Sequence, residues 1–249
     1  MDDLLRATAR AEADHFWFRG FRWFVTPLIR RALAGRSGAR LLDCGCGTGA
    51  NLVIDRIRYG AAYGFDRSRV GLQLARRAGR RRVARAIVGA APFASAAFDL
   101  VTSFDVLYSL PEQEESAAVS EMYRLLKPGG FVLINVAAME ILRGDHSVLS
   151  HELRRYDRAR LRGLVTRAGF DIVRLTYTNQ ALFLPILALR TLHRRRGLAS
   201  EAEATQEIAV PSAPINGVLS AILFGESLWL RCFDAPFGSS LLCLARKPR

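Results

Sequence analysis

Apolar and polar residues alternate along the chain in two different periods. Short apolar runs predict buried strands, and longer stretches whose apolar residues recur every three to four positions predict helices. The predicted strands are residues 39–44, 61–66, 85–89, 98–103, 131–136, 171–177 and 239–246. The predicted helices are residues 50–58, 69–80, 113–127 and 158–170. Strands that alternate with helices predict an α/β fold with a doubly wound, mostly parallel, seven-stranded sheet.

Further segments flank this alternating core, and we expect all of them to form a single domain. Its parts would be an N-terminal helical cap (1–38), the core (39–178), a helical insertion (179–238) and the last strand (239–249). The insertion contains two apolar helical patterns, at 180–193 and 215–233. It is therefore either a lid or a surface for a partner, and a second copy of the chain could cover it as a homodimer.

Charge and composition limit the partners. The formal net charge is +13, and only Lys127 and Lys247 are lysines, so 34 of the 36 basic residues are arginines. The arginines are spread over most predicted helices, which argues against a nucleic-acid partner. The runs 76–82 and 194–196 leave contact with phosphates open as an alternative.

The sequence shows neither an export leader nor a membrane span. The segment 1–16 is acidic and amphipathic, and the longest apolar stretch, 181–189, is interrupted by Pro185. A span needs roughly 20 apolar residues. With four cysteines in such a chain, we expect reduced thiols and a cytoplasmic location.

The stretch LLDCGCGTGA (41–50) is the first candidate for chemistry, as a metal site, a redox pair or a nucleotide cradle. Gly45, Gly47 and Gly49 would let a ligand approach backbone amides at the end of the first strand. Cys44 and Cys46 have no second pair at zinc-ligand spacing, so we expect no metal and interpret these thiols as small buried side chains.

Asp43 precedes the glycines and completes the pattern DxGxGxG, which resembles the first motif of class I S-adenosylmethionine-dependent methyltransferases. Gly45, Gly47 and Ala50 also satisfy the dinucleotide pattern GxGxxA, but a carboxylate is unfavourable beside a diphosphate and favourable beside a sulfonium and an ammonium. The resemblance implies a Rossmann-like fold and S-adenosylmethionine as cofactor, with S-adenosylhomocysteine as product. It also implies that the glycine turn, including Cys46, contacts the cofactor.

Two further motifs extend the resemblance over residues 40–136. Asp66 ends the second predicted strand 17 residues after Gly49, the interval at which a carboxylate reaches ribose hydroxyls, with Arg67 beside it. The other motif is the segment 98–110 followed by LLKPGG (125–130). In the family, the residues after the fourth strand flank the transferred methyl group. Here they are Ser103, Phe104 and Asp105, with Tyr108 near the acceptor.

The chain departs from the family pattern after the third strand. Many relatives carry an aspartate there that receives the adenine amino group, whereas IVGAAPF (87–93) offers only Gly89, Ala90 and Ala91. We therefore expect backbone groups or apolar contacts to hold the adenine. A histidine that many relatives carry near Ser109 is also missing.

The flanking segments resemble a bacterial methyltransferase subgroup. EADHFWFRGFRWF (12–24) is similar to its E..HWWFRGRR segment, which implies that this segment closes over the cofactor, with His15, Trp17, Arg19 or Arg22 near it. A packing helix with aromatic core residues is the alternative. The segment 144–161 is similar to a second subgroup feature, HxRRY. It would place His146 and His151 at the carboxyl edge of the sheet, with His151 as base, Tyr156 as second catalytic residue and Arg155 orienting the substrate. His151 could instead only bond the loop.

These features together predict an S-adenosylmethionine-dependent methyltransferase. Its acceptor would be a small molecule, a hydroxyl or amine of a secondary metabolite or saccharide. The alternatives are an RNA or protein methyltransferase, an inactive cofactor-binding partner protein, and a NAD-dependent dehydrogenase.

Overall fold

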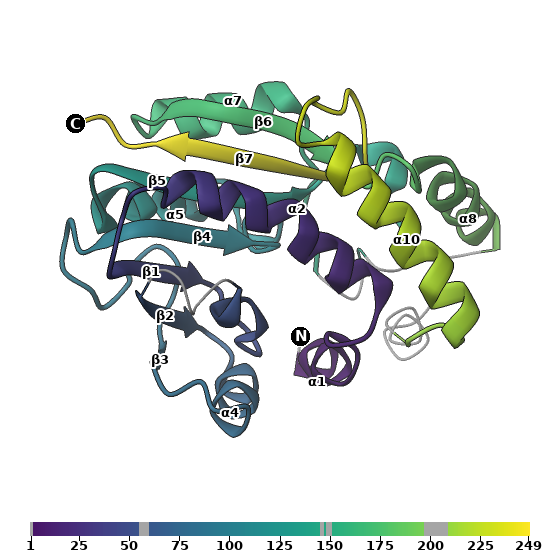
Figure 1. The fold of residues 1–249 in the computed structure, drawn as a ribbon, viewed down its shortest axis with the longest axis horizontal. Coiled ribbons are helices and arrows are strands. Elements are labelled where there is room, and N and C mark those ends of the chain that lie inside the picture. Colours follow the sequence, from purple (N-terminus) through teal and green to yellow (C-terminus); the bar gives the residue numbers. More distant parts are fainter. Residues whose placement is uncertain (1, 55–59, 145–146, 148–150, 197–208) are drawn as a thin grey trace.

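A seven-stranded sheet forms the centre of the computed structural model, which describes residues 2–54, 60–144, 147, 151–196 and 209–249 (Figure 1). The strands are β1 (Ala39–Cys44), β2 (Gly60–Asp66), β3 (Val83–Arg85), β4 (Phe98–Phe104), β5 (Leu126–Ala137), β6 (Asp171–Thr178) and β7 (Ser240–Arg246). Their order is β3-β2-β1-β4-β5-β7-β6. Strands β1 to β5 pair in parallel, and β7 runs antiparallel to β5 and β6. The doubly wound, mostly parallel fold is thereby confirmed.

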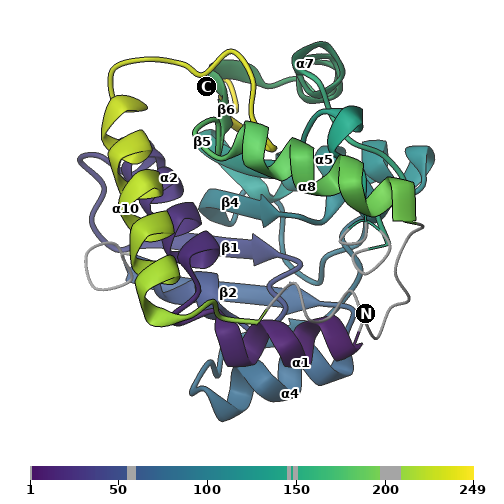
Figure 2. The ribbon, with the colours of Figure 1, turned by 90° about the vertical axis from the view of Figure 1, so that its right-hand side faces the viewer.

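Helices cover both faces of this sheet. They are α1 (Asp2–Ala11), α2 (Phe16–Ala32), η1 (Ala50–Val53), α4 (Arg69–Arg77), η2 (Leu107–Ser109), α5 (Glu112–Leu125), η3 (Glu140–Leu142), α7 (Arg158–Arg167), α8 (Phe183–Arg196) and α10 (Ala213–Trp229). Helices α2 and α10 lie on one face, and α5 and α7 lie on the other (Figure 2). In the described part of the chain, no helix combines the length and the apolar character needed to cross a bilayer.

Two predicted strand boundaries were wrong for local reasons, and a predicted helix is described only in part. The third strand is Val83–Arg85 instead of 85–89, because a bridge between Ile87 and Ala90 turns the chain there. Strand β5 begins at Leu126 instead of 131, because Leu126 already pairs with Phe98 before the Gly129 turn. The predicted helix 50–58 is described only as the short helix η1, and residues 55–59 lie outside the described part.

The segment between β6 and β7 contributes α8 and α10, and α10 packs against α2. A Cβ on Gly20 of α2 would lie 2.5 Å from Leu223 Cδ1, so the two helices are in close contact. The amide of Asn216 also bonds the N-terminal segment: it accepts from Phe16 N (2.8 Å) and donates to the Asp14 carbonyl (2.9 Å). Helices α1, α8 and α10 thus surround the carboxyl ends of β1, β2 and β4 (Figure 2).

Candidate functional site

The glycine turn joins β1 to η1 at the carboxyl edge of the sheet. Gly45, Gly47 and Gly49 all have positive φ angles (81°, 49° and 74°), which glycine adopts at low cost. A Cβ on Gly45 would lie 2.4 Å from Val106 Cγ2, so the chain after β4 packs directly on this turn. The Gly45 and Cys46 amides both donate to the Phe65 carbonyl (2.8 and 2.9 Å), which fixes the turn against β2.

Asp43 is buried beneath the turn and keeps one oxygen without a partner. The residue is 4% exposed, and its Oδ1 accepts from the Thr102 hydroxyl (2.7 Å). Among the described residues, Oδ2 has no hydrogen-bond partner. Burial, together with the charge of Asp66, raises the pKa of Asp43 to about 7, although the hydrogen bond from Thr102 lowers it. A buried carboxylate oxygen without a donor is costly, so the arrangement suits a ligand that brings a cation or a donor.

Asp66 connects the end of β2 to the glycine turn. Its Oδ2 accepts from the Gly47 amide (2.8 Å) and its Oδ1 accepts from the Ser68 amide (2.7 Å). Each carboxylate oxygen can accept a second hydrogen bond, and the residue is only half-buried. It can therefore fix the turn and also receive the hydroxyls of a ribose. The adjacent Arg67 is exposed, and its carbonyl accepts from Arg85 Nε (3.1 Å).

The turn after β3 carries no carboxylate of its own. Gly89 and Ala90 are exposed in the turn that the Ile87–Ala90 bridge closes. The next amide, Ala91 N, donates to Glu121 Oε1 (2.9 Å). This turn therefore presents backbone groups and small side chains, and a contact with adenine stays a prediction.

The end of β4 holds an aromatic pair and a carboxylate. Phe104 meets Phe21 of α2 edge to face, with ring centroids 4.9 Å apart. Asp105 follows with a φ of +59°, a strained conformation for a residue other than glycine. Asn135 Nδ2 donates to its Oδ1 (2.9 Å), while the buried Asn135 Oδ1 has no partner among the described residues. Protein atoms around the carboxyl raise the pKa of Asp105 to about 7 although the residue itself is exposed, and the charge of Glu152 contributes.

The N-terminal segment lies over the glycine turn through residues that the sequence did not single out. Glu12 Oε2 accepts from the Thr48 hydroxyl (2.6 Å), and burial raises the pKa of Glu12. A Cβ on Gly47 would lie 3.1 Å from Leu5 Cδ2, so α1 touches the turn directly. Only the acidic and amphipathic pattern of residues 1–16 indicated such a helix, and nothing in it specified Thr48 as the partner.

Trp17 and Arg22 take part in the connection between α1 and α2. The Arg22 guanidinium donates to the carbonyls of Glu12 (2.8 Å) and Ala13 (3.2 Å). The Trp17 amide donates to Nδ1 of His15, which caps α2 (3.1 Å). Arg22 thus bonds the backbone of Glu12, the residue whose side chain contacts Thr48.

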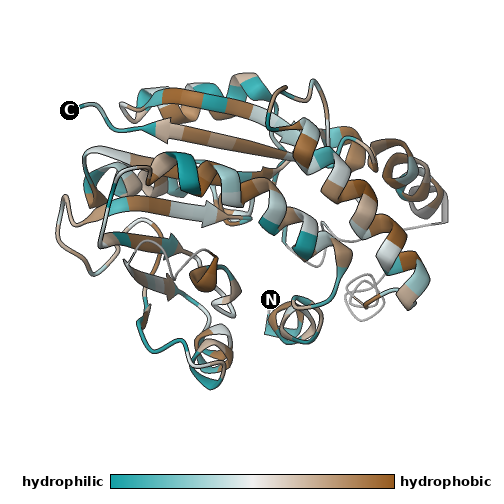
Figure 3. Ribbon diagram, in the orientation of Figure 1, coloured by the Kyte–Doolittle hydropathy of each residue, from teal (hydrophilic) through white to brown (hydrophobic). Residues whose placement is uncertain are grey.

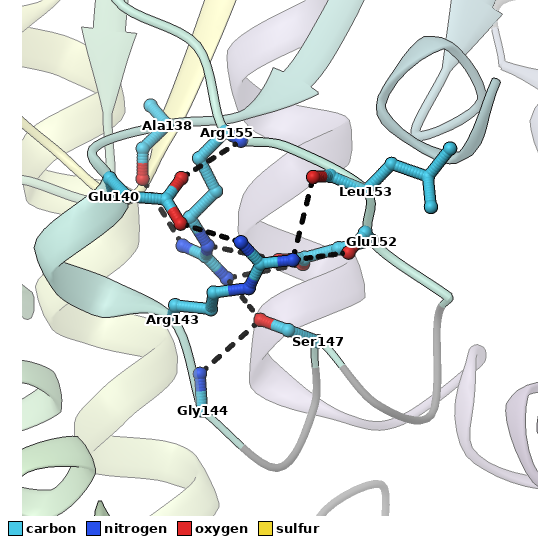
Figure 4. Close-up of polar contacts among 8 residues, drawn as sticks. All are labelled: Ala138, Glu140, Arg143, Gly144, Ser147, Glu152, Leu153 and Arg155. Atoms are coloured by element: carbon cyan, nitrogen blue, oxygen red, sulfur yellow. Dashed lines mark hydrogen bonds and ion pairs between the residues drawn. The ribbon is translucent and has the colours of Figure 1, made fainter. Parts of the chain in front are cut away.

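The loop between β5 and α7 engages Arg155 in an internal network (Figure 4). Arg155 Nε and Nη2 donate to the Glu152 carboxylate (2.9 and 3.1 Å), and Nη1 donates to the Ala138 carbonyl (3.1 Å). Arg143 completes the network by donating to Glu140 (2.7 Å) and to the Glu152 carbonyl (2.8 Å). Both side chains of the Arg155–Glu152 ion pair are buried. The Arg155 guanidinium is thus engaged within the loop, and its contact with the substrate stays a prediction.

The structure also keeps the Tyr156 hydroxyl away from solvent. Tyr156 is 1% exposed, its hydroxyl donates to Glu115 of α5, and burial raises its pKa. The role of Tyr156 as second catalytic residue stays a prediction, and in this structure its hydroxyl is bonded to Glu115. His151 is exposed, with a φ of +51°, and Tyr108 is buried, with its carbonyl accepting from Leu153 N (2.9 Å). His146 lies outside the described residues.

The cysteines carry free thiols. Cys44 and Cys46 are buried, and burial raises the pKa of both thiols. They therefore behave as small apolar side chains. Within the described ranges, no three histidine, cysteine or acidic side chains converge as metal ligands do.

The chain is similar to known methyltransferases. Residues 42–134 match the family model for a methyltransferase domain. A relative from Mycolicibacterium smegmatis (strain ATCC 700084 / mc(2)155), named "Probable S-adenosylmethionine-dependent methyltransferase", is 29% identical over 163 residues, which are 64% of this chain and 61% of that protein. The chain thus matches less than two thirds of this relative's length.

Solved structures share the fold. Phosphoethanolamine N-methyltransferase 2 of Haemonchus contortus, in complex with S-adenosyl-L-methionine, has a TM-score of 0.61 at 20% identity, over 100% of this chain and 58% of that chain. The [4+2]-cyclase SpnF has a TM-score of 0.57 at 24% identity, over 90% of this chain and 80% of that chain. At these identities the likeness establishes the architecture alone.

Proposed function

We propose that this chain is a class I S-adenosylmethionine-dependent methyltransferase and that it methylates a hydroxyl or amine of a small molecule, such as a secondary metabolite or a saccharide. The observation that carries the proposal is the buried Asp43 oxygen without a donor beneath the glycine turn. The cofactor of this family supplies an activated methyl group on a positively charged sulfonium, together with an ammonium. A carboxylate in this place matches that charge and would repel a diphosphate.

The residues around the turn fit the cofactor in three respects. Asp43 would compensate its positive charge, Asp66 would accept from the ribose hydroxyls, and the exposed turn at Gly89 and Ala90 would contact the adenine. Phe104 would pack beside the cofactor at the end of β4. The contact between Glu12 and Thr48 would help to keep water out, because α1 lies on the turn.

A hydroxyl or ammonium acceptor loses a proton as it gains a methyl group. We propose Asp105 as the group that receives this proton, because it follows β4 at the carboxyl edge and the protein around its carboxyl raises its pKa to about 7, close to the pH at which a base is most effective. Asn135 would hold the carboxylate in place through its Nδ2 donor. His151, the base that the sequence suggests, remains the alternative because it is exposed on the neighbouring loop.

Two neighbours support a small acceptor by their names, a phosphoethanolamine N-methyltransferase and a [4+2]-cyclase. The arginines are distributed along the whole sequence, which favours this class over RNA. The free thiols support a reducing, cytoplasmic location as part of the same proposal.

Calorimetric titration with S-adenosylhomocysteine and with NAD tests the proposed function. We expect the wild-type chain to bind S-adenosylhomocysteine and not NAD. Asp66→Ala should weaken that binding by roughly 10- to 100-fold, because one carboxylate holds a diol. Asp171→Ala, which removes an exposed carboxylate at the start of β6, is the matched control and should leave the affinity unchanged. Saturable binding of NAD alone would overturn the proposal.

A further inference from the structure

The excess positive charge of the chain arises mainly in one segment, because the acidic residues that would offset it are missing there. Residues 67–98 contain eight arginines and no aspartate or glutamate. This segment therefore carries eight of the 13 net positive charges of the chain. Arginines occur along the whole sequence, so the absence of carboxylates is what distinguishes the segment.

The arginines of this segment form one surface, which α4 and the edge strand β3 make together. Arg69 and Arg76 lie two helical turns apart and therefore on the same side of α4. Arg76 Nη2 donates to the Val83 carbonyl of β3 (3.5 Å), and Arg85 Nε donates to the Arg67 carbonyl just before α4 (3.1 Å). Figure 3 shows hydrophilic colour along the chain that joins α4 and β3. We call six exposed arginines of this surface the basic face: Arg67, Arg69, Arg76, Arg77, Arg81 and Arg85.

In the part of the chain that the structure describes, no carboxylate forms an ion pair with the basic face. The described ion pairs join residues outside this segment, for example Arg124 and Glu121 (2.7 Å). The carboxylates of Asp2 and Asp66 lie at the start of α4, but both accept hydrogen bonds from Ser68 (2.9 and 2.7 Å). Several arginines elsewhere thus have internal partners of opposite charge, whereas those of the basic face have none among the described residues.

Folding alone does not account for these charges. Arg76 and Arg77 stand in the last turn of α4, where a positive charge is favourable, but Arg69 stands in the first turn, where it is unfavourable. The side chains of Arg69, Arg77 and Arg81 make no hydrogen bond or ion pair with the described residues. Like charges on one surface also repel one another. The basic face therefore lowers the stability of the free chain, and a partner of opposite charge would offset this effect.

We propose that the basic face docks an acidic partner protein, through a helix or loop that carries several aspartate and glutamate side chains. Guanidinium groups bind carboxylates through two parallel hydrogen bonds. Ile87, which follows β3 and is 61% exposed, supplies the apolar centre that protein interfaces have within a polar rim. Nucleic acid fits less well, because no aromatic side chain of residues 67–98 is exposed for base stacking.

Fluorescence anisotropy of a labelled poly-L-glutamate peptide, at about 150 mM salt, tests the proposal with the full chain. We expect saturable binding to the wild type. The triple variant Arg69→Glu, Arg77→Glu and Arg81→Glu should bind at least roughly 10-fold more weakly, because three attractive charges become repulsive. Its melting temperature should not fall, since these side chains have no described contacts and a carboxylate at position 69 suits the start of α4.

The matched control reverses three exposed arginines on other elements, Arg31→Glu, Arg162→Glu and Arg231→Glu, and reaches the same net charge. It should weaken binding far less. Equal weakening in the two triple variants, or no saturable binding to the wild type, would overturn the proposal.

Two further probes distinguish the other polyanions. A duplex RNA, or vesicles of phosphatidylglycerol, are titrated against the same three proteins. If either binds more tightly than poly-L-glutamate and is lost in the variant of the basic face, the proposal is overturned in favour of nucleic acid or of a lipid surface. None of these measurements requires the cofactor or methyl transfer, so the docking face and the proposed function can fail independently.

Discussion

Asp43 is a residue whose burial opposes the stability of the protein without ligand. Its pKa is raised from 3.8 to about 7, so the folded chain binds a proton more tightly than the unfolded chain. The contribution of such a carboxyl to the free energy of unfolding is greatest below about pH 4 and falls as pH rises to about 7. The residue that would attract a cationic cofactor therefore costs stability at physiological pH.

Asp43→Asn should remove this pH dependence. The amide keeps the shape and the Thr102 contact but carries no charge. Relative to the wild type, its unfolding free energy should be higher at pH 8 than at pH 5 by about 2 kcal/mol. Urea unfolding of both proteins at the two pH values measures the difference, with Asp171→Asn as the exposed control. An equal difference at pH 5 and pH 8 would show that Asp43 does not titrate in this range.

Asp105 and His151 are distinguished by substitution in a turnover assay. If Asp105 receives the proton, Asp105→Asn should lower kcat at least 100-fold while the affinity for S-adenosylhomocysteine stays unchanged. His151→Ala should then have little effect. The activity of both variants is measured as formation of S-adenosylhomocysteine, with a panel of phenols and primary amines as methyl acceptors. Full activity in Asp105→Asn together with loss in His151→Ala would return the role of base to the histidine.

At the scale of elements, the sequence predicts the position of a strand well when the burial pattern of that strand is simple. Strand β1 lies where its apolar run predicts, because it is a central strand that ends at the glycine turn. The third strand was displaced, because a single bridge in the loop after it could not be predicted from local propensity. The sequence likewise could not predict which side of α10 is buried, because the partners of Asn216 lie 200 or more residues away in the sequence.

The site shows the same division between local and distant information. The glycine turn, Asp43 and Asp66 follow one another at fixed spacing, so the sequence was sufficient to bring them together. The pairs Asn135–Asp105 and Tyr156–Glu115 join different elements through side-chain directions, which have no signature in a single sequence. The Glu12–Thr48 contact likewise depends on how α1 lies over the turn.

At the scale of the whole molecule, the last strand completes the sheet. Strand β7 lies between β5 and β6, and residues 241–245 are at most 1% exposed. A chain that ends at Ser239 would lose both sets of pairings and expose the core side of β5. We expect it to lack a cooperative thermal transition, because the contacts removed join the two halves of the sheet.

Near-ultraviolet circular dichroism during heating measures this effect. The matched control ends at Lys247, which keeps β7 and the bonds from the Lys247 ammonium to the carbonyls of Tyr123 (2.8 Å) and Leu126 (2.9 Å). This control should melt cooperatively. The glycine turn and the proposed cofactor contacts all precede residue 137, yet the strands that carry them should depend on β7 for their order. A native-like transition in the chain that ends at Ser239 would show that β1 to β5 form a stable sheet on their own.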